Sequence, residues 1–133
     1  FDTNQLLQQA KDKNEIVSAT SNQLIKLLRK DIVFYLADGE VLDTPHIFSV
    51  TEENLESCIS ENEKAVAGWV LKNNKRAGAT TGTLSNAKCL YLAVRSSSMV
   101  YGVIGIVMGE IPLDPFENSI LLSILGECAL ALE

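Results

Sequence analysis

The chain has 133 residues, of which 47% are hydrophobic and 21% are charged, and its formal net charge is −6. This length fits one domain with a sizeable core, and this composition excludes a mostly disordered chain. The acidic balance without a basic stripe makes nucleic acid a poor partner, and no apolar run approaches the roughly 18 residues of a membrane helix, so the fragment is not expected to span a membrane.

The first thirty residues predict helix. Residues 1–11 carry few apolar anchors and are interpreted as the end of a linker or signalling helix, and residues 12–133 as a single sensory domain. Asp12 with Glu15 three residues later is a capping-box pattern. A helix over 12–30 is then predicted from residues that fall at helical spacing on one face, namely Ile16, Val17, Thr20, Leu24, Leu27 and Leu28.

The segment "DIVFYLADGEVL", residues 31–42, predicts a hairpin with its turn at Asp38-Gly39. Its first strand is apolar on both sides, so we expect it to be central and covered on both faces. One side would carry Ile32, Phe34 and Leu36, and the other Val33, Tyr35 and Ala37. Pro45 limits the second strand, which "HIFSV" extends.

Ser60 and Glu63 form another capping-box pattern, which predicts a helix from about residue 61 to 74 with Trp69 on its apolar face. A loop follows, and then two strands, over 89–95 and from about residue 100. Gly102 and Gly105 lie inside the second of these strands, where interior glycines often mark a close approach to the sheet.

The last helix is predicted to begin at Asp114, because Pro115 suits the first helical position and Glu117 completes a capping box. Apolar residues cover much of its circumference, so one face would pack on the sheet and the rest needs a second partner, most simply a second copy of the chain. The element order predicts an α+β domain with a central antiparallel sheet flanked by helices. The terminal helices would pack together on one face.

No metal site or catalytic residue is predicted. Cys58, Cys89 and Cys128 form no C-x-x-C pair, so they are interpreted as buried or half-buried reduced thiols. The acidic residues that precede and open the second long helix lack the EF-hand pattern and are interpreted as a solvated face; they are Glu52, Glu53, Glu56, Glu61 and Glu63.

The loop "RAGATTGTL", residues 76–84, is not a phosphate-binding P-loop. It lacks the lysine of that motif, and it follows a helix and precedes a strand, so no helix N-terminus backs its amides. Two alternatives remain: the loop lines a ligand pocket, or it closes over the core with its hydroxyls wet or bonded to backbone.

With its flanking segments, this loop resembles the GAF domain of KdpD-type sensor histidine kinases, the potassium-responsive sensors of bacterial two-component systems. The matching segments are "AVAGWV" (65–70), "AG" (77–78), "T-x-T-L" (81–84), "AK" (87–88), "LYL" (90–92) and "YGV" (101–103). The resemblance covers nearly the whole chain. The family loop usually reads A-G-x-G-T-D-T-L-P, and here Thr80 replaces a glycine, Gly82 the acidic residue and Ser85 the proline.

The resemblance implies a GAF fold and a place on the cytoplasmic side of the membrane, before the kinase core. The parent would be a sensor histidine kinase in the phosphorelay control of potassium-uptake genes. This fragment carries neither the phospho-acceptor nor the ATP site, so no cofactor is expected here and ATP would bind only the kinase domain. The expected partners are a second copy through the terminal helices, the adjacent kinase domains and an unidentified small ligand.

A small-molecule pocket usually combines apolar walls with a few convergent polar groups. The candidate lining residues are Tyr35, Trp69, Arg76, Thr81, Thr83 and Tyr91. The alternative function is an enzyme on the same fold, such as a free methionine sulfoxide reductase. That chemistry would need Cys58 and Cys89 as an attacking and a resolving thiol.

Overall fold

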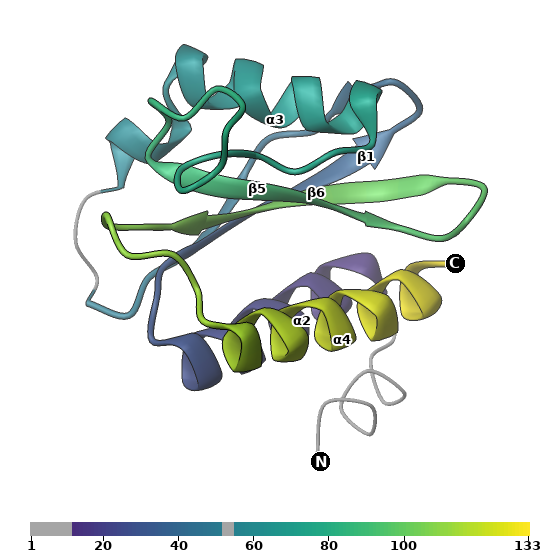
Figure 1. Ribbon diagram of the computed structural model, residues 1–133. Coiled ribbons are helices and arrows are strands. Elements are labelled where there is room, and N and C mark those ends of the chain that lie inside the picture. The colour runs from purple at the N-terminus through teal and green to yellow at the C-terminus, as the bar shows by residue number, and fades with distance from the viewer. Residues whose placement is uncertain (1–11, 52–54) are drawn as a thin grey trace.

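An antiparallel sheet runs through the middle of the computed structural model, which describes residues 12–51 and 55–133 (Figure 1). The strand order is β2-β1-β6-β5-β4, and β3 also pairs with β1. The strands are β1 (Ile32–Asp38), β2 (Val41–Leu42), β3 (His46–Phe48), β4 (Ala77–Gly78), β5 (Cys89–Arg95) and β6 (Val100–Val107). The predicted α+β class with a central antiparallel sheet is confirmed. The proposed linker helix over residues 1–11 lies outside the described residues, as do Glu52 and Glu53.

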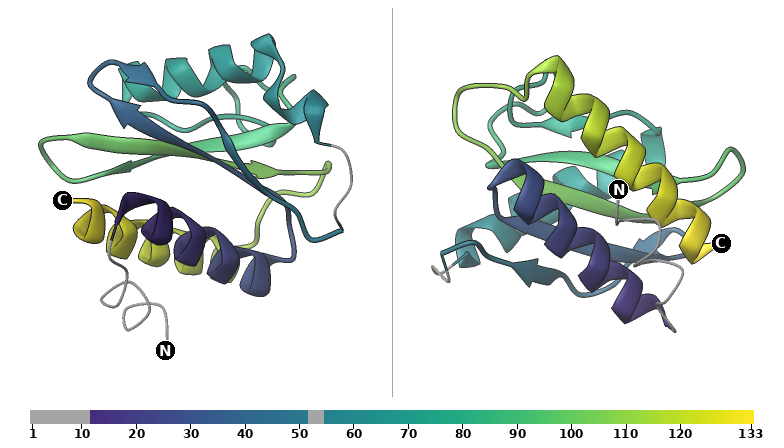
Figure 2. Two further views of the ribbon diagram at one scale, coloured as in Figure 1. Left: turned by 180° about the vertical axis from the view of Figure 1, so that it is seen from behind. Right: turned by 90° about the horizontal axis from the view of Figure 1, so that it is seen from below.

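Helices cover both faces of the sheet (Figures 1 and 2). Helices α2 (Lys13–Leu28) and α4 (Pro115–Leu132) lie side by side on one face. Helix α3 (Glu61–Asn73) and the short 3₁₀ helix η1 (Glu56–Ile59) lie on the other. The terminal helices of the described fold therefore pack together, as predicted.

The central strand β1 separates two hydrophobic cores. Its residues Ile32 and Phe34 are buried against α2 and α4, whereas Val33 and Tyr35 are buried against α3. This alternation is the period of two that the sequence pattern predicted. Because both faces are covered, a substitution of a β1 residue perturbs only the hydrophobic core on the side to which its side chain points.

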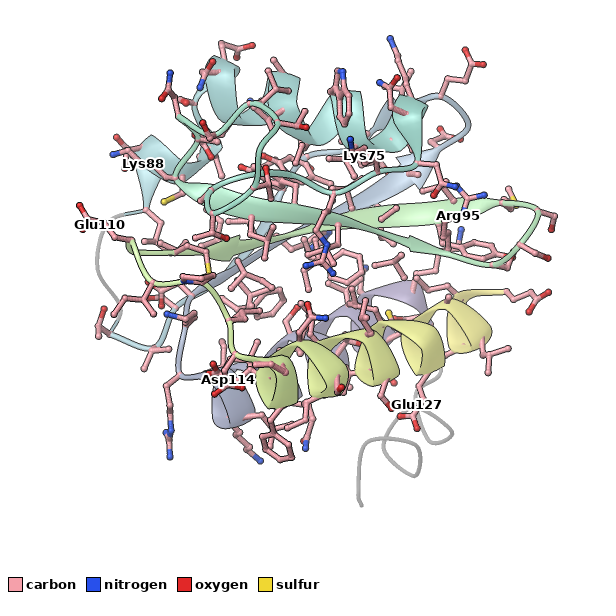
Figure 3. The ribbon with its side chains drawn as sticks, in the orientation of Figure 1. Lys75, Lys88, Arg95, Glu110, Asp114 and Glu127 are labelled. Carbon is pink, nitrogen blue, oxygen red and sulfur yellow. The ribbon has the colours of Figure 1, made fainter. Side chains whose placement is uncertain are left out.

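Helix ends follow the predicted capping residues. The Asp12 side chain accepts a hydrogen bond from the Glu15 amide at 2.9 Å at the start of α2. The predicted capping box of α4 is complete, since Glu117 donates its amide to Asp114 at 2.8 Å and accepts from the Asp114 amide at 3.0 Å. Figure 3 shows Asp114 where α4 begins. These local hydrogen bonds determine where α2 and α4 begin.

The second strand of the predicted hairpin is broken in two. Strand β2 pairs with the far end of β1, while β3 pairs with its beginning. Between them lies the segment with Pro45, which cannot donate to a ladder. The turn falls on Gly39-Glu40, one residue later than predicted, because Asp38 still pairs with Val41. This break leaves the segment 40–45 free to form the wall of a cavity.

The expectation about long apolar runs was wrong for α4, which by length and composition could cross a membrane. Core helices of compact domains pass the same test. Here six of its residues are buried, packed against the sheet and α2; they are Leu121, Ile124, Leu125, Cys128, Ala129 and Leu132. In this structure α4 is a core helix with a second apolar surface.

Candidate ligand-binding pocket

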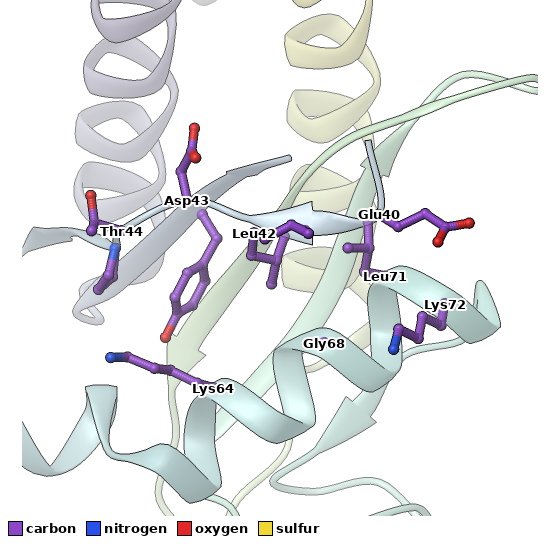
Figure 4. Close-up of a pocket in the computed structure, with 11 residues that line it drawn as sticks. Glu40, Leu42, Asp43, Thr44, Lys64, Gly68, Leu71 and Lys72 are labelled. Carbon is purple, nitrogen blue, oxygen red and sulfur yellow. The ribbon is translucent and has the colours of Figure 1, made fainter. Parts of the chain in front are cut away.

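A cavity of about 380 Å³ lies between α3 and the segment that follows the β1–β2 turn (Figure 4). This volume is within the range of small-molecule sites, which starts near 300 Å³. Eleven residues line it: Tyr35, Glu40, Val41, Leu42, Asp43, Thr44, Pro45, Lys64, Gly68, Leu71 and Lys72. The site thus combines β1, the broken second strand and one face of α3.

The α3 wall comes from the spacing of its residues. Lys64, Gly68, Leu71 and Lys72 are separated by four, three and one positions, which places them on one helical face. Gly68 leaves room on that face, because a Cβ atom built there would meet nothing within 4 Å. A larger side chain at this position would therefore enter the cavity without displacing backbone.

Tyr35 brings an unsatisfied polar group to this cavity. The residue is only 1% exposed, and its hydroxyl has no hydrogen-bond partner among the described residues. Burial raises the pKa of Tyr35 to about 12, so the hydroxyl stays protonated at neutral pH. An unpaired buried hydroxyl costs about 1–3 kcal/mol. A ligand acceptor in the cavity would remove that cost.

The charged groups around the cavity point in different directions. In Figure 4 the Lys64 ammonium lies between α3 and the opposite wall, the Asp43 carboxylate points away from α3, and the Glu40 carboxylate extends sideways, away from Lys64. Lys64 is 3.8 Å from the Glu61 carboxylate. That exposed pair is weak, since such pairs are typically worth less than about 1 kcal/mol. Lys64 is therefore available to a ligand.

Beside the cavity, a buried carboxylate joins α3 to β5. Glu63 is 2% exposed, and it accepts hydrogen bonds from the Lys88 amide at 2.9 Å, the Cys89 amide at 3.2 Å and the Tyr91 hydroxyl at 2.8 Å. All three partners donate to the carboxylate oxygens, so each of these buried donors is satisfied. The cluster holds the first residues of β5 against the start of α3.

The interpretation of Glu63 as part of a solvated acidic face was therefore wrong. The Glu63 amide does bond to the Ser60 side chain, at 3.3 Å, but the carboxylate turns to β5. A signal was present in the sequence: Glu63 precedes the buried Ala67 and Val70 by four and seven residues, so it lies on the buried helical face.

Tyr91 and Trp69 belong to the same layer as the cavity without lining it. Tyr91 is buried, with its hydroxyl on Glu63, and its ring lies over Gly105, where a Cβ atom would be 2.6 Å from the ring. This is the close approach that the glycines inside β6 predicted. Trp69 is half-buried on α3, next to the lining residue Gly68. In the described part of the chain, Tyr35 alone of the six candidates lines the cavity.

Arg76 does not line the cavity but contacts α4, on the opposite side of the sheet from α3. Its Nη1 donates to Asn118 Oδ1 on α4 at 3.0 Å. The hydrogen bond therefore links the segment that leaves α3 with the second turn of α4, across the edge of the sheet.

Thr81 and Thr83 close the loop upon itself. The Thr81 hydroxyl lies 2.8 Å from the carbonyl oxygens of Gly78 and Thr83, and it accepts from the Thr83 amide at 3.1 Å. Gly78 also donates its amide to the Thr83 carbonyl at 2.8 Å. Thr80 adopts a left-handed backbone with φ of 64°, at the position where the resembled family carries a glycine, which tolerates this conformation. The geometry corresponds to the second of the two alternatives for this loop.

The three cysteines are free and buried. Cys58 and Cys89 share the core under α3, and burial raises the pKa of Cys89 above its ordinary range. A thiol that keeps its proton is a poor nucleophile. The geometry therefore does not favour the methionine sulfoxide reductase alternative. Within residues 12–51 and 55–133, no group of three or more His, Cys, Asp or Glu side chains is placed to hold a metal ion.

The sequence is similar to part of a known signalling protein. It is 31% identical over 122 residues to the sensor protein KdpD of Clostridium acetobutylicum, a match that covers 90% of this chain. The chain spans 14% of the length of that relative. No protein-family model matches the chain.

Solved structures show the fold. The GAF domain of the potassium sensor histidine kinase KdpD from Escherichia coli superimposes with a TM-score of 0.75 and 19% identity, over 98% of this chain and 88% of that one. The GAF domain of an Acinetobacter phosphoenolpyruvate-protein phosphotransferase gives a TM-score of 0.68 and 11% identity, over 98% and 87%. The α+β arrangement described above is therefore the GAF fold.

Proposed function

We propose that this chain, a GAF domain whose sequence matches part of a KdpD sensor protein, is a sensory and relay module within a KdpD-type sensor histidine kinase. The observation that carries the proposal is the 31% identity across 90% of the chain, together with the shared fold. The fragment itself is non-catalytic in this proposal. It passes a signal to the kinase core of the parent, on the cytoplasmic side of the membrane, in phosphorelay control of potassium-uptake genes.

The domain organisation follows from the same proposal. In this proposal residues 1–11 belong to the connection with the preceding part of the parent, and residues 12–133 form the sensory domain. ATP binds the adjacent kinase domain. Helices α2 and α4 are the first and last elements of the described fold and lie side by side, which supports them as the input and output connections.

The proposed relay runs from the cavity to α4. Tyr35 contacts the ligand directly, and Trp69 and Tyr91 support the α3 layer around it. Thr81 and Thr83 keep the following loop in shape. Arg76, bonded to Asn118, transmits shifts of this layer to α4. Ligand binding would then favour one of two arrangements of the output helix, which is the two-state element that signalling needs.

Filling the cavity tests the sensory role. We expect Gly68→Phe to place a ring in the cavity and to change the ratio of kinase to phosphatase activity of the full-length parent by about fivefold or more, the usual lower bound for coupling between sites. The measurement is phosphorylation and dephosphorylation of the response regulator by the full-length protein in vesicles.

The matched control is Ala65→Phe, which adds the same ring to an exposed position of α3 outside the cavity. Thermal unfolding of both variants checks that the domain is folded. A folded Gly68→Phe protein with the activity ratio of the wild type would contradict the sensory role.

We also propose that the domain forms a homodimer through α2 and α4. Three large apolar side chains of α4 are exposed away from the core, Phe116 by 74%, Leu122 by 49% and Leu130 by 71%. Glu127 lies on the side of α4 that faces away from the sheet (Figure 3). An apolar helix surface of this kind is typical of a contact with a second protein surface.

Replacing Leu130 by Asp is expected to weaken self-association by about tenfold or more, because burial of one leucine contributes about 1.5–3 kcal/mol. Sedimentation equilibrium measures the dissociation constant. The control is Leu84→Asp, an equally drastic change at a 47% exposed leucine of the loop. A strictly monomeric chain at high concentration, also when extended past Glu133, argues against the dimer.

A further inference from the structure

We infer that the cavity beside α3 takes a small organic acid, with an apolar body and one carboxylate that Lys64 and Tyr35 hold. This is the cavity to which the proposed function assigns the sensory role. The ligand class depends on that role only in that binding would be the signal that the domain senses. Its chemistry follows from the direction of the groups around the cavity.

The walls select an apolar body. Val41, Leu42 and Pro45 form one wall, and Leu71 with the backbone of Gly68 forms the other. The Tyr35 ring completes the lining from β1. A ligand that fills about 380 Å³ between these groups gains from burying its own apolar surface. A strongly hydrated, wholly polar ligand would lose water without this gain.

The polar groups select an acceptor. The protonated Tyr35 hydroxyl is buried and unpaired, so it can donate a hydrogen bond into the cavity. The Lys64 ammonium lies on the same side, between α3 and the wall, in Figure 4. An ammonium and a hydroxyl together supply the two donors that the two oxygens of one carboxylate accept.

A cationic ligand finds no matching group. Glu40 and Asp43 line the cavity, but in Figure 4 the Asp43 carboxylate points away from α3 and the Glu40 carboxylate extends sideways, away from Lys64. Glu61 is the other nearby acid, and its side chain is 95% exposed. The charge that faces inward is therefore positive, although the chain as a whole is acidic.

A phosphate ester is a weaker match than a carboxylate. Phosphate sites use free amides at a helix N-terminus, whereas the lining residues of α3 start at Lys64, whose amide already bonds to the Ser60 carbonyl at 2.9 Å. The cavity offers side-chain donors, which come from Tyr35, Thr44, Lys64 and Lys72, and no exposed cradle of helix amides. Tyr35 and Lys64 can hold one carboxylate without such amides.

Binding of benzoate to the 133-residue chain, compared with benzyl alcohol and benzylamine, tests the inference by isothermal titration calorimetry. We expect benzoate to bind most tightly and benzylamine least. Lys64→Met, which keeps the apolar stem, should weaken benzoate binding by about tenfold or more, as for hydrogen bonds to a charged group. Tyr35→Phe should weaken it several-fold, and Gly68→Phe should abolish it.

The matched control is Lys75→Met, which removes an exposed lysine that lies outside the cavity lining (Figure 3), and it should leave the affinity unchanged. Tighter binding of benzylamine, no binding of benzoate, or equal losses in Lys64→Met and Lys75→Met would each overturn the inference. These results are separate from the kinase assay: an altered kinase response in Gly68→Phe without benzoate binding would reject the ligand class and leave the sensory role standing.

Discussion

Glu63→Ala is expected to destabilise the domain by about 3 kcal/mol or more, one of the two largest effects among our predictions. The substitution leaves the amides of Lys88 and Cys89 and the hydroxyl of Tyr91 without their acceptor. Each buried donor that loses its partner costs about 1–3 kcal/mol. Chemical denaturation followed by circular dichroism measures the loss as a lower midpoint at an unchanged slope.

Three further variants separate the carboxylate from its surroundings. Glu61→Ala removes an exposed acid two residues earlier and should change stability by less than about 0.5 kcal/mol. Glu63→Gln keeps one acceptor oxygen but turns an NH₂ donor toward a backbone donor, so it should fall between the wild type and alanine. The destabilisation by Tyr91→Phe and Glu63→Ala together should be smaller than the sum of the two single effects, because both substitutions remove the same hydrogen bond between Tyr91 and Glu63. A loss below about 1 kcal/mol in Glu63→Ala would contradict the role of this residue.

Glu63 also illustrates which features the sequence could predict. The capping residues Asp12 and Asp114 act within four residues of themselves, and their helices begin where the pattern placed them. The alternation along β1 needs only its own seven residues, and both faces were assigned correctly. Glu63, by contrast, depends on donors 25 to 28 residues away. Local patterns carry no information about which strand will pass that helix face.

The cavity was missed for the same reason. Its walls come from segments 40–45 and 64–72, which lie about twenty residues apart and meet only through the sheet. Tyr35 could be nominated because a tyrosine on the α3-facing side of a central strand points at whatever covers that face. The break at Pro45 was visible as a limit to the strand, but its consequence, an open wall beside α3, needed the paired positions of β2 and β3.

The loop after α3, residues 76–84, was recognised in the sequence as a candidate ligand-binding motif, but its contacts in the structure are with the protein itself. Gly78 of β4 pairs with Leu90 of β5. The amide of the following residue, Ala79, donates a hydrogen bond to the Cys89 carbonyl at 2.9 Å. The loop is therefore tied to β5 at the residue that also donates its amide to Glu63. The loop glycine and the buried carboxylate stabilise the same end of β5 from two sides.

Gly78→Ala is the second substitution for which a large loss is expected, about 3 kcal/mol or more. Gly78 has φ of 100°, a conformation that other residues adopt only at a cost of about 1–3 kcal/mol. An added Cβ would also overlap the carbonyl oxygen of Cys89, which belongs to the backbone of the neighbouring strand and cannot rotate away. Denaturation measures the loss. Gly82→Ala is the matched control, because Gly82 is exposed and its Cβ would meet nothing within 4 Å, so it should stay within about 0.5 kcal/mol of the wild type.

Hydrogen exchange links the two largest predictions. If Gly78→Ala forces β4 away from β5, the amides of Lys88 and Cys89 should exchange faster, as they should when Glu63→Ala removes their acceptor. Gly82→Ala should leave both amides protected, although it lies in the same loop. Loss of protection confined to the loop in Gly78→Ala, with Cys89 unchanged, would show that Glu63 protects the Lys88 and Cys89 amides without help from β4. In that case the glycine would matter only for the shape of the loop, and its stability cost should fall to the backbone strain of a single residue.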